Sequence, residues 1–185
     1  LSRALADKVV ERIGGQPGTV QEYQSKVVKQ SAPLPYNLSA LQIDASRQLN
    51  LSPKQTLDLC QQLYERHKLI TYPRSDCRYL PNEHHRLASQ VAAAIGMVQP
   101  TLQSAVQSAD FQLRSAAWND TKVSAHHGII PTERRMNGES LSRQELALYT
   151  LIARHYLAQF YPPQTFEDTR LLIRIAGGLF LAKGR

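Results

Sequence analysis

Strand-like sequence near both ends of this chain, with helical sequence between, is the feature that most constrains its fold. Thr19 to Lys29 is rich in β-branched residues, and Thr169 to Ile175 alternates apolar with basic residues. Gly177-Gly178 then turns the chain into Leu179-Phe180-Leu181, a pattern typical of a β-hairpin. We expect these strands to lie together, with the helical block inserted between them. The predicted fold class is therefore α+β.

Proline-rich stretches indicate where the helical block starts and ends. Ala32-Pro33-Leu34-Pro35 and Pro162-Pro163 both break regular structure. We therefore expect a helical domain over residues 34–162. Residues 1–33 and residues 163–185 would then be two parts of one β-rich domain.

Several helix boundaries are predicted by local signals. A helix over residues 1–13 would end at Gly14-Gly15. Capping boxes, in which a serine precedes Gln or Glu by three positions, are predicted at Ser39, Ser52 and Ser142. The second is reinforced by proline at the next position. A further helix is expected to open at Pro81 and to carry His84-His85 on its surface.

Composition places the chain among ordinary globular proteins. It has 185 residues, of which 42% are hydrophobic and 20% charged, and its formal net charge is +7. This balance favours a polyanionic partner. No apolar run approaches the length that spans a membrane. Two cysteines, Cys60 and Cys77, have neither metal-ligand nor disulfide spacing, which suits a reducing cytosol. Because Leu1 is not a natural start, we interpret the chain as a fragment of a longer protein.

Leu69 to Leu80 contains a candidate for covalent chemistry on a phosphodiester. Tyr72 is a potential nucleophile, because a deprotonated phenol can attack phosphorus and leave again. Arg74, two residues later, could hold phosphate oxygens in a bidentate fork. The alternative is a buried strand leading into a tight turn, with Tyr72 half-packed and Arg74 solvated.

Basic and aromatic residues alternate around this candidate. Between residues 64 and 80, basic side chains including Lys68 and Arg78 are interleaved with three tyrosines. Basic groups bind phosphates and aromatic faces accept unstacked bases, so the mixture suits single-stranded nucleic acid. A solvated basic face above core tyrosines would give the same pattern.

His126-His127 is the second candidate. Adjacent residues point in different directions, so one histidine is expected to be functional and the other packed. An imidazole could donate a proton or a hydrogen bond to a scissile phosphate. The alternative is one satisfied core histidine beside a solvated one. The sequence contains no His-x-x-x-His pair, no paired-cysteine motif, no Asp-x-Asp motif and no glycine-rich phosphate loop.

The two candidate segments together resemble the signatures of type IA DNA topoisomerases. The segments are Leu69-Ile70-Thr71-Tyr72-Pro73-Arg74-Ser75-Asp76 and Ala125-His126-His127-Gly128-Ile129-Ile130-Pro131-Thr132. The first, continued by Cys77-Arg78-Tyr79-Leu80-Pro81, looks most like the bacterial topoisomerase III branch. Gly128 departs from the alanine that is usual after the histidine pair. The resemblance covers essentially the whole chain.

The resemblance implies a fold and a mechanism. Residues 34–162 would be a winged-helix-like (CAP-like) domain, and the flanking β segments would belong to an arch-forming domain. Tyr72 would cleave one DNA strand and form a 5′-phosphotyrosyl intermediate, followed by strand passage and religation without ATP. Arg74 would contact the scissile phosphate and His126 would position it. Lys68, Ser75, Arg78 and His127 are further expected DNA contacts.

The resemblance also implies a cofactor and a partner. The family's Mg²⁺ is held by an acidic toprim-type domain that these residues do not contain, so no metal ligand is assigned here and the fragment alone is expected to be inactive. The expected partner is DNA, preferably single-stranded, in the bacterial cytoplasm at the nucleoid. Two alternatives are a DNA-binding helical module without catalysis and a tyrosine recombinase, whose upstream His-x-x-Arg element is not found.

Overall fold

The computed structural model describes residues 2–185 and divides the chain into two compact units. Residues 1–30 with 163–185 form one unit, and residues 31–162 form the other. Leu1, where the first predicted helix begins, lies outside the described residues. The chain passes between the units after Gln30 and after Pro162, and the predicted domains 1–33, 34–162 and 163–185 remain a prediction. The α+β class predicted from the sequence is confirmed.

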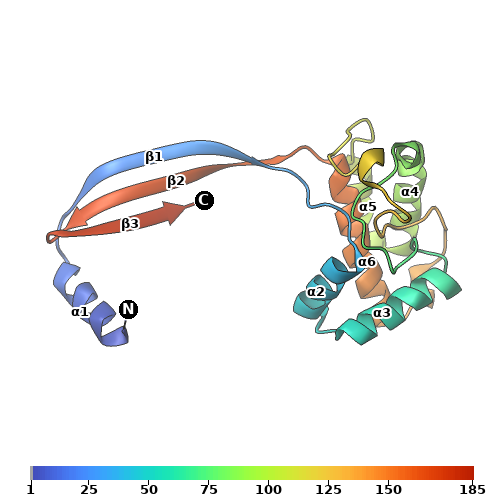
Figure 1. The fold of residues 1–185 in the computed structure, drawn as a ribbon, viewed down its shortest axis with the longest axis horizontal. Helices are drawn as coiled ribbons and strands as arrows, with labels where there is room; N and C mark the ends of the chain where they lie inside the picture. The colour runs from blue at the N-terminus through green and yellow to red at the C-terminus, as the bar shows by residue number, and fades with distance from the viewer. Residues whose placement is uncertain (1) are drawn as a thin grey trace. The chain divides into compact units, whose positions relative to one another are not determined.

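The first unit contains one helix and a three-stranded antiparallel sheet in the order β1-β2-β3 (Figure 1). The helix is α1 (Arg3–Ile13), and the strands are β1 (Gly18–Gln30), β2 (Gln164–Ile175) and β3 (Gly178–Gly184). β1 and β2 pair from Gly18↔Ile175 to Gln30↔Gln164, with one bulge near Val20 and Glu22. The predicted pairing of the two ends and the hairpin at Gly177-Gly178 are both confirmed.

The second unit is mainly helical. Its α-helices are α2 (Leu38–Leu49), α3 (Pro53–Gln61), α4 (Ala88–Val98), α5 (Gln103–Ser108) and α6 (Arg143–Leu157). A π-helical turn, Gln62–Arg66, continues α3, and a 3-10 helix, Asn82–Leu87, leads into α4. Shorter 3-10 turns lie at Pro100–Leu102, Asp120–Lys122, Gly138–Ser140 and Ala158–Phe160. None of the helices within residues 2–185 is both long and apolar enough to cross a membrane.

The capping signals predict two of three helix starts correctly. Ser52 and Ser142 each form a capping box, with Gln55 and Glu145 respectively. The predicted box at Ser39 is wrong, because Asn37 caps α2 instead, its side chain accepting a hydrogen bond from the Ala40 N–H. Asparagine is as good an N-cap as serine, so this helix begins two residues earlier than expected.

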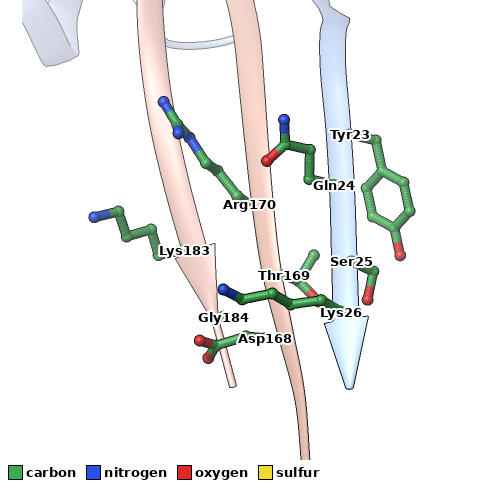
Figure 2. Close-up of a pocket in the computed structure, with 9 residues that line it drawn as sticks. All are labelled: Tyr23, Gln24, Ser25, Lys26, Asp168, Thr169, Arg170, Lys183 and Gly184. Atoms are coloured by element: carbon green, nitrogen blue, oxygen red, sulfur yellow. The ribbon is translucent and has the colours of Figure 1, made fainter. Parts of the chain in front are cut away.

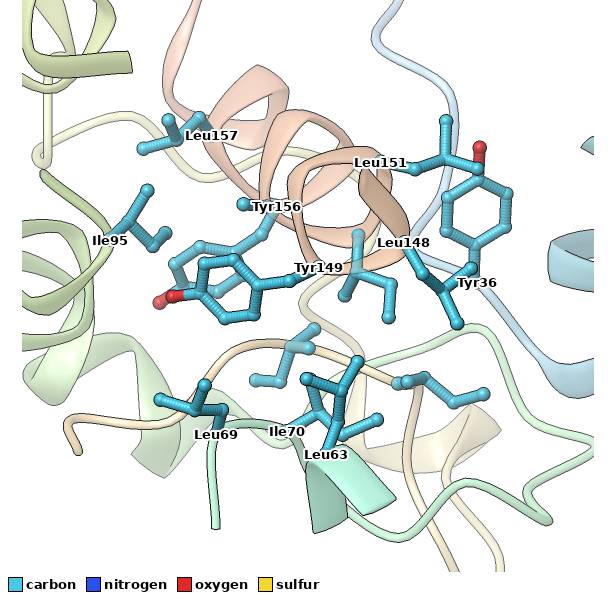
Figure 3. Packing of buried hydrophobic residues seen from close by; sticks show 14 of the residues in the cluster. Tyr36, Leu63, Leu69, Ile70, Ile95, Leu148, Tyr149, Leu151, Tyr156 and Leu157 are labelled. Atoms are coloured by element: carbon cyan, nitrogen blue, oxygen red, sulfur yellow. The ribbon is translucent and has the colours of Figure 1, made fainter. Parts of the chain in front are cut away.

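α6 forms the centre of the core. It contacts α2 and α3, and Figure 3 shows Leu148, Tyr149 and Tyr156 of α6 facing Leu63, Leu69 and Ile70. All of these side chains are almost completely buried. Burial of such aliphatic and aromatic groups is the dominant stabilising term for a domain of this size. Leu69 and Ile70 lie three and two residues before Tyr72, so the candidate site is attached to this core.

Gln159 links the beginning and the end of the helical unit. Its side chain is buried, and its Nε2 donates to the Pro33 carbonyl at 2.7 Å. Its Oε1 accepts from the Ser115 hydroxyl at 2.7 Å. Because every polar group of the amide has a partner in the interior, Gln159 fixes residue 33 against the end of α6.

Candidate functional site

The two sequence segments singled out above lie side by side in the structure. Ile70 and Pro131 form an antiparallel bridge. The Thr71 N–H donates to the Ile130 carbonyl at 2.9 Å, and the Thr132 N–H donates to the Leu69 carbonyl at 3.0 Å. The structure therefore brings the Tyr72 and His126 segments together, although more than fifty positions separate them along the chain.

The Thr71 hydroxyl joins these segments a second time. It donates to the Gly128 carbonyl at 3.1 Å and accepts from the Ile130 N–H at 3.0 Å. A β-branched side chain has few rotamers, so both bonds are formed with little loss of side-chain entropy. The sequence analysis assigned no role to Thr71, because no local signal identifies this bridging hydroxyl.

Tyr72 lies between two aromatic rings at the surface of the helical unit. Its ring centroid is 4.4 Å from that of His126, with the planes tilted by 37°. Tyr64 meets it edge-on at 5.7 Å. The side chain is 37% exposed, and within residues 2–185 its hydroxyl forms no hydrogen bond. The ring is thus held in place while the phenolic oxygen is available to a ligand.

A strained turn at Lys68 precedes Tyr72. After the π-helical turn, Lys68 adopts a left-handed conformation with φ of 57°, and its carbonyl accepts from the Thr132 hydroxyl at 2.6 Å. His67 is held by Glu145 at 3.0 Å between Nε2 and Oε1, with both side chains nearly buried. π-Helical turns are frequent near functional sites, where the extra residue redirects the chain.

Exposure alternates along the residues that follow Tyr72. Arg74 is exposed like Tyr72, whereas Pro73 and Ser75 are buried. Arg74 forms no ion pair or hydrogen bond through its side chain within residues 2–185, so its guanidinium is available to an anion. Ser75 is only 1% exposed, and its hydroxyl accepts from the Cys77 N–H at 3.1 Å. Its hydroxyl therefore shapes the loop from the interior.

Arg78 and Lys68, two other predicted DNA contacts, have different surroundings. Arg78 donates through Nε to the Pro35 carbonyl and through Nη2 to the Leu34 carbonyl, both at 2.9 Å. It ties the Tyr72 loop to the first residues of the helical unit. The Lys68 ammonium is exposed and lies 5.6 Å from the centroid of the Tyr64 ring.

The two adjacent histidines occupy different environments. His126 is exposed and packs on Tyr72. His127 is half-buried, with Nδ1 2.8 Å from the Gly128 carbonyl oxygen and its ring against His84. Burial lowers the pKa of His127, which favours the neutral imidazole. The His84 side chain is 35% exposed, in agreement with its predicted surface location. His85 is more enclosed, with Nε2 2.9 Å from the Leu113 carbonyl oxygen and its ring edge-on to Trp118.

Gly128 permits close packing behind the histidines. A Cβ at this position would lie 3.2 Å from Pro35 Cβ and 3.4 Å from the Arg78 carbonyl carbon. Its own N–H donates to the Tyr79 carbonyl at 2.9 Å. The glycine therefore lets the histidine segment approach both the Tyr72 loop and the residues leading into the helical unit.

The site does not contain a ligand set for the magnesium ion that the resemblance implies. Within residues 2–185, no three histidine, cysteine or acidic side chains lie close enough together to hold a metal. Magnesium prefers several oxygen ligands, whereas Tyr72 is surrounded by an imidazole and a second phenol ring.

The chain is similar to known DNA topoisomerases. The sequence model of the DNA topoisomerase family matches residues 1–185. DNA topoisomerase 3 of Vibrio cholerae is 56% identical over 184 residues, which are 100% of this chain and 28% of that protein. DNA topoisomerase 3 of Bacillus subtilis is 37% identical over 188 residues, covering 98% of this chain and 25% of that protein.

A solved structure shares the fold. Full-length topoisomerase I from Thermotoga maritima matches with a TM-score of 0.66 and 26% identity, covering 97% of this chain and 29% of that one. The chain thus spans little more than a quarter of each of these relatives. A family match over its whole length shows that this chain belongs to the type IA DNA topoisomerases and is similar to bacterial DNA topoisomerase III.

Proposed function

We propose that this chain supplies the nucleophile of a type IA DNA topoisomerase. The observation that carries the proposal is the contact between the Tyr72 and His126 rings, at 4.4 Å, on segments joined by Thr71. Relatives named DNA topoisomerase 3 support DNA as the substrate.

The proposed reaction is a transesterification. The Tyr72 oxygen forms a bond to the phosphorus of one DNA strand as the bond from phosphorus to the 3′ oxygen breaks. The phenol loses its proton, and the leaving oxygen gains one to become a free 3′-hydroxyl. One phosphoester bond replaces another, so the 3′-hydroxyl can reverse the step without ATP after a second strand has passed.

Two neighbouring side chains have proposed roles in this step. The free, exposed guanidinium of Arg74 would bind the non-bridging oxygens, where charge increases in the transition state. His126 would donate a hydrogen bond to the same phosphate and keep it beside the Tyr72 ring. Lys68 and His127 would contact the strand nearby, and Tyr64 and Tyr72 would favour unstacked, single-stranded DNA.

Ser75 and Arg78 do not take part in this proposal as DNA ligands. Their polar atoms contact the chain itself, so we propose that they hold the loop that presents Tyr72 and Arg74. The magnesium ion expected from the resemblance would depend on residues outside the described ones. Residues 1–185 alone are therefore expected to bind DNA without cleaving it.

The polarity of the covalent adduct tests the proposal. A full-length protein is assembled from this chain and the segments of its relatives that the chain does not cover. It is incubated with magnesium and with single-stranded DNA labelled at its 3′ end. Denaturing gels should show the 3′ label on the protein, while a 5′ label should leave on a fragment ending in a 3′-hydroxyl. Tyr72→Phe should abolish the adduct.

Tyr23→Phe is the matched control, because Tyr23 is also an exposed tyrosine, at 61%, but lies on the sheet. It should form the adduct normally. An adduct that survives Tyr72→Phe, or one that retains the 5′ label, would remove Tyr72 from the role of nucleophile. Binding of DNA without any adduct would favour the non-catalytic helical module.

A further inference from the structure

One face of the three-stranded sheet gathers basic side chains from all three strands. Arg170 of β2 lies directly opposite Lys183 of β3, and on its other side opposite Gln24 of β1. Lys26 lies two residues beyond Gln24, so it points to the same face. Figure 2 shows Gln24 and Lys26 projecting from β1 on the side away from Tyr23 and Ser25.

The basic side chains on this face are not neutralised within the protein. Arg170 and Lys183 are like charges in directly opposite positions, an arrangement that weakens a sheet. Within residues 2–185, neither of them, nor Lys26, forms an ion pair. The sheet therefore places cations together at some expense of its own stability.

The acidic groups on the same face are already engaged. Asp168, opposite Lys26, pairs with the Arg185 guanidinium at 3.1 Å between Oδ1 and Nε. The Glu22 carboxylate accepts a hydrogen bond from Gln24. Neither carboxylate is therefore placed to neutralise the pair formed by Arg170 and Lys183.

A hollow lies over these cations. Its volume is about 620 Å³, and the residues of this face that line it are Gln24, Lys26, Asp168, Arg170 and Lys183. The Gln24 amide adds a neutral hydrogen-bonding group beside the positive charges. Such a combination is typical of surfaces that contact phosphate and sugar oxygens.

The chemistry of the face favours backbone contacts over base contacts. Phe166 is the aromatic residue of β2 that points to the same face as Arg170. The Arg185 guanidinium lies over its ring, 4.2 Å from the centroid. The exposed ring of Tyr23 also borders the hollow, but it projects from the opposite side of β1 (Figure 2). Among the described residues, this face therefore offers charge but no open ring on which a base could stack. Charge without stacking gives binding that depends on salt and not on sequence.

We propose that this face, formed by Lys26, Arg170 and Lys183, is a second DNA-binding site that contacts the phosphate backbone without sequence preference. It rests on the proposed function in that the topoisomerase reaction supplies DNA as the ligand. The Tyr72 site lies in the helical unit and recognises the strand that is cut. The sheet site holds DNA by charge alone.

Salt dependence of binding by the whole 185-residue chain tests the site. The probe is a short fluorescein-labelled oligo(dT), followed by fluorescence anisotropy over a range of salt concentrations. Each phosphate contact to a single strand contributes about 0.7 to the slope of log K against log salt, so Arg170→Gln/Lys183→Gln should reduce the slope by about 1.4.

Arg3→Gln/Lys8→Gln is the matched control, because it removes the same charge from exposed positions of α1 in the same unit. It should leave most of the slope in place. Asp168→Asn, which removes an acid from the face, should tighten binding. Equal slopes for the sheet variant and the α1 variant would overturn the proposal.

Chemical modification of the unsubstituted chain gives a test that does not depend on a variant folding. Oligo(dT) should protect Lys26 and Lys183 from acetylation by acetic anhydride, while the exposed Lys8 of α1 remains reactive. Acetylation of all three at unchanged rates would also overturn the proposal. Tyr72→Phe should leave protection unchanged, so loss of the adduct and loss of the sheet site are separate results.

Discussion

Each of the two units is stabilised internally by a different kind of interaction. Every buried apolar residue in the described part of the chain lies between Pro35 and Phe160, inside the helical unit. In the sheet unit β1 is almost entirely exposed, and Val20, Tyr23 and Val27 are among the large exposed side chains. The helical unit is stabilised by side-chain packing, whereas the sheet depends mainly on its backbone ladder.

This difference matches the requirements of the two proposed sites. Covalent chemistry requires atoms held within fractions of an ångström, and Tyr72 follows Leu69 and Ile70, which are 0% and 1% exposed. Binding of a phosphate backbone by charge tolerates much looser geometry. The packed unit therefore suits the nucleophile, and the open sheet suits the proposed backbone contact.

Removal of a core ring should give the largest loss of stability and so the clearest contrast between the two units. Phe160 is fully buried and contacts Phe111, Trp118 and Tyr156. Phe160→Ala should lower the free energy of unfolding by about 3–5 kcal/mol, because a cavity replaces the ring. Val27→Ala on the sheet, where Val27 is 69% exposed, should change it by less than about 0.5 kcal/mol.

Urea denaturation followed by far-UV circular dichroism measures both variants. If Val27→Ala destabilised the protein as much as Phe160→Ala, the sheet would depend on side-chain packing after all. The contrast between the units would then be wrong.

The hydroxyl of Thr71 should have the next largest effect. Thr71→Val keeps the shape but leaves the buried Ile130 N–H without its partner, which should cost about 1–3 kcal/mol. It should also lower the yield of the Tyr72 adduct, because the Tyr72 and His126 segments lose their shared bond. Thr71→Ser should restore both properties.

Thr169→Val is the control from the sheet unit. Thr169 lies on β2 opposite Ser25 and Gly184, away from the buried core. The measurements are urea denaturation and the denaturing-gel adduct assay. An adduct yield unchanged in Thr71→Val would show that the backbone bonds alone fix Tyr72 against His126.

The smallest expected effect concerns Glu145. Burial would raise the pKa of this carboxyl, but hydrogen bonds from Ser142 and His67 outweigh it and lower the pKa. The carboxylate therefore stabilises the fold above the unfolded-state pKa of about 4.3, and this contribution is lost as the pH falls through the lower folded-state value. Glu145→Gln keeps an amide able to complete the capping box but removes the charge.

Thermal unfolding at a series of pH values checks this prediction. Wild type should exceed Glu145→Gln by about 1 kcal/mol at neutral pH, and the two should converge below about pH 4. Asp168→Asn in the sheet is the comparison, because its ion pair with Arg185 is exposed and should matter little. A constant difference across the pH range would assign the effect to shape, not charge.

Local signals account for the parts of the fold that the sequence predicts well. The stop of α1 before Gly14, the caps at Ser52 and Ser142, and the turn at Gly177 each depend on a few neighbouring residues. Side-chain chemistry makes Tyr72, Arg74 and the His126-His127 pair candidates, and the resemblance assigns their catalytic roles and the domain roles; all of these remain predictions.

The parts that sequence reasoning missed depend on contacts between distant residues. Asn37 displaced Ser39 as a cap while its amide also donates to the Asp76 carbonyl at 3.0 Å. The bridging hydroxyl of Thr71 and the bonds from Arg78 to residues 34 and 35 likewise join segments far apart in the chain. No local pattern encodes such partners, because either residue alone is compatible with many environments.

The hydrogen bond from Gln159 to Pro33 has a consequence for the order of folding. Pairing Gln30 with Gln164 requires closure of a loop over residues 31–163, which costs about 4 kcal/mol of chain entropy. Once the helical unit has folded, Gln159 holds the two ends of that loop near each other. β1 and β2 can then pair like the two strands of a short hairpin. We therefore expect this pairing, although distant in sequence, to form as fast as a local one.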